Sequence, residues 1–114
     1  MLIPTGSICD WPFLSYQHGT VLHREEVASR LYGEIVIGYI ASGSYGFITS
    51  MPDYLGLGDS PGMHPYVHSN TEASASIDML RASKEFCNNN NILYNEQLFL
   101  AGYSQGGHAT MALH

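Results

Sequence analysis

The sequence predicts an α/β fold in which a mostly parallel sheet carries helices on both faces. Short apolar segments alternate with longer segments of helical character along the whole chain, which is typical of this class. Loops rich in glycine or polar residues follow the apolar segments, at residues 17–20, 52–66 and 102–107. The composition is 45% hydrophobic with only 12% charged residues, which favours a buried core and argues against disorder.

Six elements are expected in chain order. They are a strand over residues 11–16, a helix over 25–42, a strand over 45–51, a helix over 69–88, a strand over 97–101 and a helix over 109–113. Each strand is a short apolar run bounded by turn-forming residues. Because helices connect them, the strands should run parallel, with their carboxyl ends on the edge where open α/β sheets bind ligands.

The two longer helices depend on different patterns. In residues 25–42, apolar residues recur at helical spacing and Gly43 is a suitable C-terminal stop, although two internal glycines weaken the pattern. In residues 69–88, Ser69 and Glu72 have the spacing of an N-terminal capping box. The residues expected to face inward on this second helix are Ala73, Ile77, Leu80 and Ala82.

The last turn carries the clearest chemical motif. Residues 102–106 read G-x-S-x-G, directly after an apolar strand and before a helix. A sharp strand-to-helix turn exposes a serine hydroxyl, and it requires small residues such as Gly102 and Gly106 on either side. Ser104 is therefore the candidate nucleophile, and the amide of Gln105 is a candidate oxyanion donor. Gly107 is expected to let the helix pack closely against the strand.

Two other interpretations of this turn stay open. A glycine-rich turn between strand and helix can be purely structural, and similar turns bind phosphate in nucleotide-binding modules. However, the turn lacks a Gly-Lys-Ser/Thr ending, and the glycine pair Gly56 and Gly58 lies in a proline-bearing loop instead of opening a helix. A peptidase remains a further alternative, because amide and ester cleavage use the same catalytic groups.

Several segments together resemble the α/β-hydrolase superfamily, within it the secreted lipase and esterase group. The segments are residues 16–20, 52–60, 64–66, 78–82 and 102–107. The resemblance implies a serine hydrolase that cleaves carboxylic esters through an acyl-enzyme, with a small acyl ester or a lipid as substrate and no cofactor or metal. It also suggests a secreted or periplasmic protein, although the chain shows no signal peptide.

The resemblance also implies roles for the loops around Ser104. Thr20 would supply the second oxyanion amide, with Gly19 allowing close approach. His18 is expected to be a structural imidazole bonded to backbone, and Asp53 and Asp59 are expected to fix their loop by bonding backbone amides.

The rest of the catalytic triad is not expected in these residues. In the superfamily the acid and the histidine follow the serine, but the ten residues after Ser104 contain no carboxylate. His108 and His114 lie on the helix that begins at the nucleophile, so neither is expected to be the base. Residues 1–114 are therefore interpreted as the N-terminal portion of one α/β-hydrolase domain, inactive by itself.

Charge and composition exclude other classes. The net charge is −6 and there are only four cationic residues, so nucleic-acid binding is not expected. No apolar run is long enough to span a bilayer. His64 and His68 are four residues apart, but proline and glycine nearby argue against a metal pair on a helix. Cys9 and Cys87 are expected to be unpaired thiols. The oligomeric state is left open.

Overall fold

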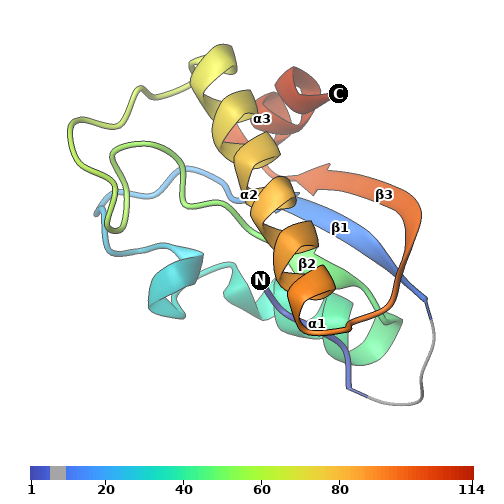
Figure 1. Cartoon of the computed structure of the whole chain (residues 1–114). Coiled ribbons are helices and arrows are strands. Elements are labelled where there is room, and N and C mark those ends of the chain that lie inside the picture. Colours follow the sequence, from blue (N-terminus) through green and yellow to red (C-terminus); the bar gives the residue numbers. More distant parts are fainter. Residues whose placement is uncertain (6–9) are drawn as a thin grey trace.

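A computed structural model describes residues 1–5 and 10–114, and strands and helices alternate as predicted (Figure 1). The elements are β1 (Trp11–Gln17), a short 3-10 helix η1 (Ala28–Arg30), α1 (Ile35–Tyr45), β2 (Ile48–Ser50), α2 (Ser69–Asn89), β3 (Tyr94–Gly102) and α3 (Gln105–Leu113). Within the described residues, no helix is long and apolar enough to cross a membrane.

The three strands form one parallel sheet in the order β2-β1-β3, which confirms the predicted fold class. Phe13 in the central strand pairs with Ile48 on one side and with Leu98 on the other. Leu2 adds an antiparallel bridge to Thr49 on the outer side of β2. The three strand ends therefore open toward the same edge, where the loops of residues 18–20, 51–68 and 103–104 begin.

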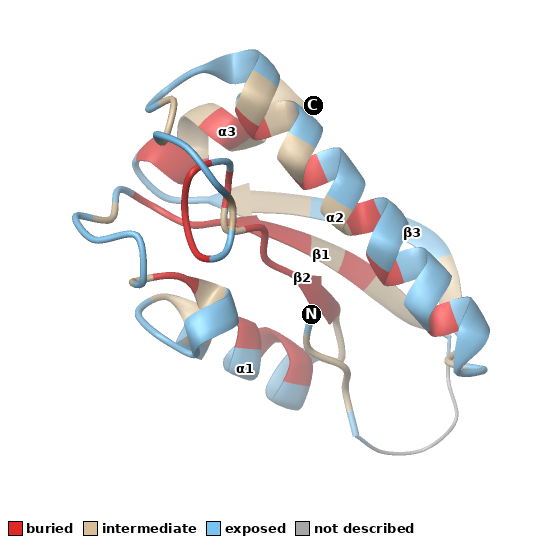
Figure 2. Cartoon of the chain, turned by 60° about the vertical axis from the view of Figure 1, so that its left-hand side comes forward, coloured by how far each residue is buried: buried red, intermediate tan, exposed pale blue. Residues whose placement is uncertain are grey.

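Helices cover both faces of the sheet, as Figure 2 shows. Side chains alternate along β2, so that its neighbouring residues contact different helices. Ile48 packs in a cluster with Leu80 of α2, whereas Thr49 Oγ1 accepts a hydrogen bond from Ser42 Oγ of α1 at 3.1 Å. The helices α1 and α2 therefore lie on opposite faces of β2.

The seam between α2 and the sheet is only partly apolar. Its buried cluster contains Phe13, Ile48, Leu80 and Cys87, and burial raises the pKa of the Cys87 thiol. Cys9 lies outside the described residues. Nearer the strand ends the seam contains hydroxyl contacts: Ser83 Oγ accepts from Ser50 Oγ at 2.7 Å, and Ser76 Oγ donates to Gln17 Oε1 at 2.8 Å.

The predicted inward face of α2 was therefore largely wrong. The buried residues of this helix are Glu72, Ser76, Leu80, Ser83 and Cys87. Of the predicted residues only Leu80 is among them, and Ile77 and Ala82 are exposed. The capping box was also wrong, because His68 is the N-cap residue and no side chain caps this helix. Because α2 contacts the sheet through hydrogen bonds as well as apolar contacts, hydrophobicity alone does not identify its inner face.

The predicted helix over residues 25–42 is interrupted. Leu31 and Gly33 have φ values of 56° and 61°, and this left-handed backbone separates η1 from α1. Val27 instead packs in a buried cluster with Tyr54 of the long loop. The helix also continues past Gly43 to Gly46, where φ is 70° and an added Cβ would lie 2.7 Å from the Trp11 ring.

Candidate active site

Ser104 lies in a strained bend between the end of β3 and the start of α3. Its backbone has φ 55° and ψ −119°, a region that non-glycine residues rarely adopt, and its side chain is exposed. The helix after it begins at Gln105, four residues earlier than predicted. A hydroxyl group in such a bend is held clear of its own strand and next to a helix N-terminus.

Two glycines make the bend possible. An added Cβ at Gly102 would lie 2.2 Å from the carbonyl oxygen of Gly106, and one at Gly106 would lie 1.9 Å from the carbonyl oxygen of Gln17. Both distances are far shorter than any tolerated contact. Gly107 differs, because its added Cβ would lie 3.9 Å from the nearest atom. The expectation that Gly107 is needed for close packing was therefore wrong.

The loop after β1 lies directly against this bend. An added Cβ at Gly19 would be 3.2 Å from the carbonyl oxygen of Tyr103, so the two backbones are in close contact. The amide of Gly19 donates to Glu34 Oε1 at 3.2 Å and is therefore occupied. Within residues 1–5 and 10–114, the amides of Thr20 and Gln105 have no hydrogen-bond partner. Two backbone donors in the two segments are therefore unoccupied among the described residues.

His18 and Asp53 hold the surrounding loops. The ring nitrogens of His18 lie 2.7 Å from the carbonyl oxygen of Gly19 and 3.2 Å from that of Asp53, and the ring packs on Tyr54 at 4.3 Å between centroids. Asp53 Oδ1 accepts the amide hydrogen of Ser29 at 3.1 Å. Both residues thus contact backbone and join the loop after β1 to the loop after β2.

Asp59 acts differently from the expectation. Within the part of the chain that the structure describes it bonds no backbone amide, and it pairs instead with the Arg30 guanidinium, which holds the pKa of the Asp59 carboxyl below its usual range. The pair ties the loop after β2 to η1, with Asp59 itself exposed. Two buried phenols also lie near the loops. Burial raises the pKa of Tyr54 and, together with the carboxyl of Glu34, that of Tyr16.

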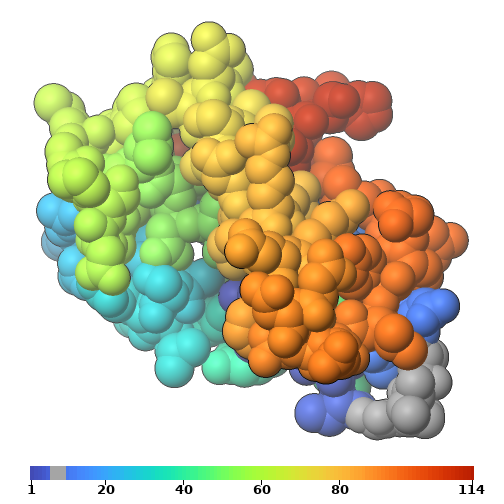
Figure 3. Space-filling view, in the orientation of Figure 1, coloured from blue at the N-terminus to red at the C-terminus, as the bar shows by residue number. Residues whose placement is uncertain are grey.

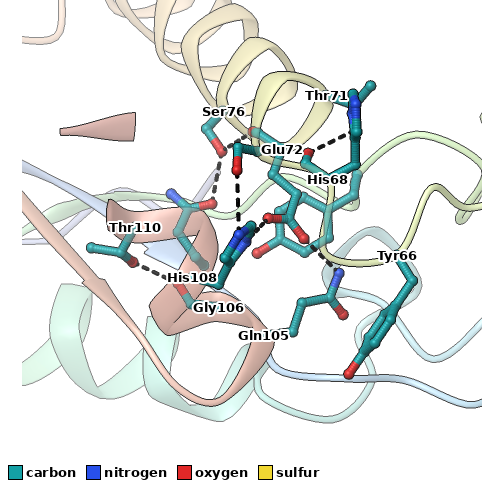
Figure 4. A network of polar contacts seen from close by, with 12 residues as sticks. Tyr66, His68, Thr71, Glu72, Ser76, Gln105, Gly106, His108 and Thr110 are labelled. Atoms are coloured by element: carbon teal, nitrogen blue, oxygen red, sulfur yellow. Dashed lines mark hydrogen bonds and ion pairs between the residues drawn. The ribbon is translucent and has the colours of Figure 1, made fainter. Parts of the chain in front are cut away.

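A polar network beneath the bend was not foreseen from the sequence (Figure 4). Glu72 of α2 is 1% exposed, and its two oxygens lie 2.8 Å from Gln105 Nε2 and 2.7 Å from His108 Nδ1. His108 Nε2 lies 3.3 Å from Ser69 Oγ. Both ring nitrogens of His108 therefore contact α2, and no hydrogen bond joins them to Ser104 Oγ.

Two hollows adjoin these loops. A cavity of about 360 Å³ is lined by residues of the loop after β1, including Thr20, and by Val27 and Tyr32. A more open hollow of about 400 Å³ separates the loop after β2 from α2 and is visible in Figure 3. The first of them is lined by Thr20, whereas Ser104 is not among its lining residues.

Comparison with known proteins gives matches among solved structures alone. No protein-family profile and no curated protein sequence matches the chain. The chain is similar to a protein from Legionella pneumophila described as a candidate hydrolase, with 45% identity, a TM-score of 0.88, and coverage of 97% of this chain and 30% of that one. It is also similar to the rice cell wall degrading esterase LipA from Xanthomonas oryzae. A ligand-bound form gives 32% identity and a TM-score of 0.85, and another form 35% and 0.81, each covering 97% of this chain and 30% of the esterase.

These similarities confirm the resemblance drawn from the motifs. The chain has a partial α/β-hydrolase fold, and its neighbours support a function of the hydrolase or esterase type. It spans about 30% of the length of the structures it matches.

Proposed function

We propose that the complete protein is a serine hydrolase that cleaves carboxylic esters, with Ser104 as its nucleophile. The observation that carries the proposal is the strained backbone of Ser104, at φ 55° and ψ −119°, between a parallel strand and a helix N-terminus. Strain of this kind costs about 1–3 kcal/mol and is concentrated at functional sites. The strained bend lies where the G-x-S-x-G motif predicts it, and this agreement supports Ser104 as the nucleophile.

The residues of this chain would act in the first half of the reaction. Ser104 Oγ attacks the acyl carbon, and its proton passes to a histidine contributed by another part of the domain. The carbonyl oxygen becomes an oxyanion, which accepts hydrogen bonds from the amides of Gln105 and Thr20. The C–O bond to the leaving group then breaks as the histidine gives its proton to that oxygen, and the alcohol leaves. Water, losing a proton to the histidine, attacks the acyl-enzyme, and the histidine returns that proton to Ser104 Oγ as the acid is released.

We further propose that residues 1–114 form the N-terminal portion of a single α/β-hydrolase domain. The support is the alignment, which uses 97% of this chain but 30% of the neighbouring structures. The triad acid and histidine would come from the remaining part of the domain. A small acyl ester or lipid is the proposed substrate class, because the similar solved structures include an esterase and, within the described part of the chain, the Gln105 amide beside Ser104 is an unoccupied donor.

The proposal is tested by labelling the complete protein with a fluorophosphonate and mapping the modified peptide. We expect one label on Ser104, and the Ser104→Ala variant should lose labelling and at least about 10³-fold in the rate of p-nitrophenyl ester hydrolysis. Ser44→Ala is the matched control, because Ser44 is an exposed serine of α1. Hydrolysis of esters at the parent rate by Ser104→Ala would reject the proposal.

The same experiment separates the alternatives. Comparable rates on p-nitroanilides and on p-nitrophenyl esters would favour a peptidase. An absence of labelling, together with thermal stabilisation by ATP or NAD, would favour the nucleotide-binding interpretation and contradict the hydrolase.

A further inference from the structure

A single buried carboxyl group joins α2 to the first turn of α3. Glu72 Oε1 accepts a hydrogen bond from Gln105 Nε2 at 2.8 Å, and Glu72 Oε2 lies 2.7 Å from His108 Nδ1. The two oxygens of this carboxyl group therefore each contact a different side chain of α3.

The side-chain amide of Gln105 is oriented with its nitrogen toward Glu72. Its nitrogen contacts Glu72 and also His64 Nε2 at 2.9 Å, while His64 Nδ1 lies 2.9 Å from the Leu55 carbonyl oxygen. The His64 ring can donate to Leu55 through Nδ1 and accept from Gln105 at Nε2, so every contact has one donor. Gln105 is 4% exposed, and its Oε1 has no partner among the described residues. The amide thus leaves its oxygen unsatisfied while its nitrogen stays on Glu72 and His64, because a flipped amide would turn that oxygen toward the carboxylate.

Apart from these side-chain contacts, the first turn of α3 is held by backbone hydrogen bonds from Gly106 and Gly107 and by the packing of Gly106 against Gln17. No side chain caps this helix at Ser104. Ser104 is held in a strained conformation, which persists only when surrounding contacts enforce it. Glu72 accepts a hydrogen bond from Gln105, the residue that directly follows Ser104. The backbone amide of Gln105 has no partner among the described residues. Contacts of the Gln105 side chain therefore constrain both the backbone of Ser104 and the position of the Gln105 amide.

We infer that Glu72 is a positioning residue, which fixes the Ser104 bend and the Gln105 amide through α3. This inference rests on the proposed function. Glu72 acts through Gln105 and His108 and does not touch substrate. Its loss should therefore reduce the rate of acylation more than the binding of substrate.

The same contacts align Ser69, His108 and Glu72 as hydroxyl, imidazole and carboxyl, as in a catalytic triad. Ser69, however, is the first residue of a regular helix and has no strained backbone. We therefore assign the imidazole and carboxyl to holding α3. Ser69→Ala should leave kcat within twofold of the parent, and a fluorophosphonate label on Ser69 would overturn this assignment.

The test compares Glu72→Ala and Glu72→Gln with a matched variant in the complete protein. Ser83→Ala is that variant, because Ser83 is buried on the same face of α2 but bonds to Ser50 of β2. We expect Glu72→Ala to lower kcat at least tenfold with KM within threefold, and to speed amide hydrogen exchange at residues 105–108 at least tenfold. Glu72→Gln keeps one acceptor for Gln105 and should give a smaller loss, of threefold or more. Ser83→Ala should lower thermal stability and leave kcat and exchange at 105–108 unchanged.

Several outcomes would overturn the inference. They are a kcat within twofold of the parent in folded Glu72→Ala, unchanged exchange at residues 105–108, or an equal loss of kcat in Ser83→Ala. If Glu72→Ala does not fold, Glu72→Gln decides, and parent-like kcat and exchange in that variant reject the inference. Full activity in Ser104→Ala, assayed alongside, would reject the proposed function separately, and the exchange measurement would still decide the role of Glu72.

Discussion

Replacing Gly106 by alanine should be among the most damaging small changes in the chain. The new Cβ would lie 1.9 Å from the carbonyl oxygen of Gln17, whereas ordinary contacts begin at 3.4 Å, so the backbones must separate by about 1.5 Å. Gln17 is fully buried and pairs with Gly102 in the sheet, so that separation disrupts the end of the β1–β3 pairing. Overpacking costs about 1–3 kcal/mol, and each lost hydrogen bond adds about 1 kcal/mol. We expect a total loss of about 3–5 kcal/mol, a large part of the usual 5–15 kcal/mol of a folded domain.

The neighbouring glycine provides the control. In Gly107→Ala the new Cβ would lie 3.9 Å from the nearest atom, and alanine is favoured over glycine inside a helix by about 1 kcal/mol. Urea unfolding of both variants of the complete protein, followed by circular dichroism, should therefore shift the midpoint down for Gly106→Ala and leave it equal or higher for Gly107→Ala. Stabilities within about 1 kcal/mol of each other would refute the reasoning.

Two further predictions concern activity and pH. Residues 1–114 by themselves should show no turnover of p-nitrophenyl acetate, because both ring nitrogens of His108 contact α2 and, within the described residues, no histidine hydrogen-bonds to Ser104 Oγ. A burst that is lost in Ser104→Ala would contradict this. Burial raises the pKa of Tyr54 above its ordinary value near about 10, and its hydroxyl donates to the His18 carbonyl oxygen at 3.2 Å. As pH rises, the unfolded chain loses the Tyr54 hydroxyl proton at a lower pH than the folded chain does. The contribution of Tyr54 to the free energy of unfolding is therefore complete below about pH 10 and falls as pH rises beyond it. Urea midpoints measured up to pH 11 should decline less steeply in Tyr54→Phe, and identical slopes would contradict the expectation.

The strands and the final turn were predictable because their signals are local. An apolar run ending in G-x-S-x-G predicts both a strand and the bend that follows it, and Ser104 lies in that bend. The strand itself is less buried than its apolar sequence predicts, because Leu98 and Phe99 are each nearly half exposed. The alternation with helices predicts parallel pairing, which the pairing of β1 with β2 and with β3 confirms. The bounds differed, since β3 begins at Tyr94 and α3 at Gln105, and the strand predicted over 45–51 is only Ile48–Ser50, with Tyr45 in α1.

The errors arose where long-range contacts override local preference. The spacing of Val27, Leu31 and Ile35 resembles one helical face, but Val27 packs against the loop after β2 and the left-handed backbone of Leu31 ends η1. On α2, polar residues face inward because Gln17 and Ser50 offer them hydrogen bonds, and those partners are distant in sequence.

Part of the site could have been found by a different pattern. Glu72 matched a local capping motif, which hid its contact with α3. Yet Glu72, Ser76, Leu80, Ser83 and Cys87 recur at intervals of three and four residues, so a stripe of small and polar residues was visible on one helical face. No sequence pattern predicts the contact of the Gly19 amide with Glu34, because the position of Glu34 depends on where α1 begins.

The hydroxyl seam between α2 and the sheet limits the positions that this helix can occupy. Apolar seams tolerate sliding, since one methyl group replaces another at little cost, whereas a hydroxyl hydrogen bond is lost when its partner moves by a single helical turn. Ser76 and Ser83 match Gln17 and Ser50 at one axial setting only. These hydrogen bonds therefore favour one axial position of α2 along the sheet over the alternative positions.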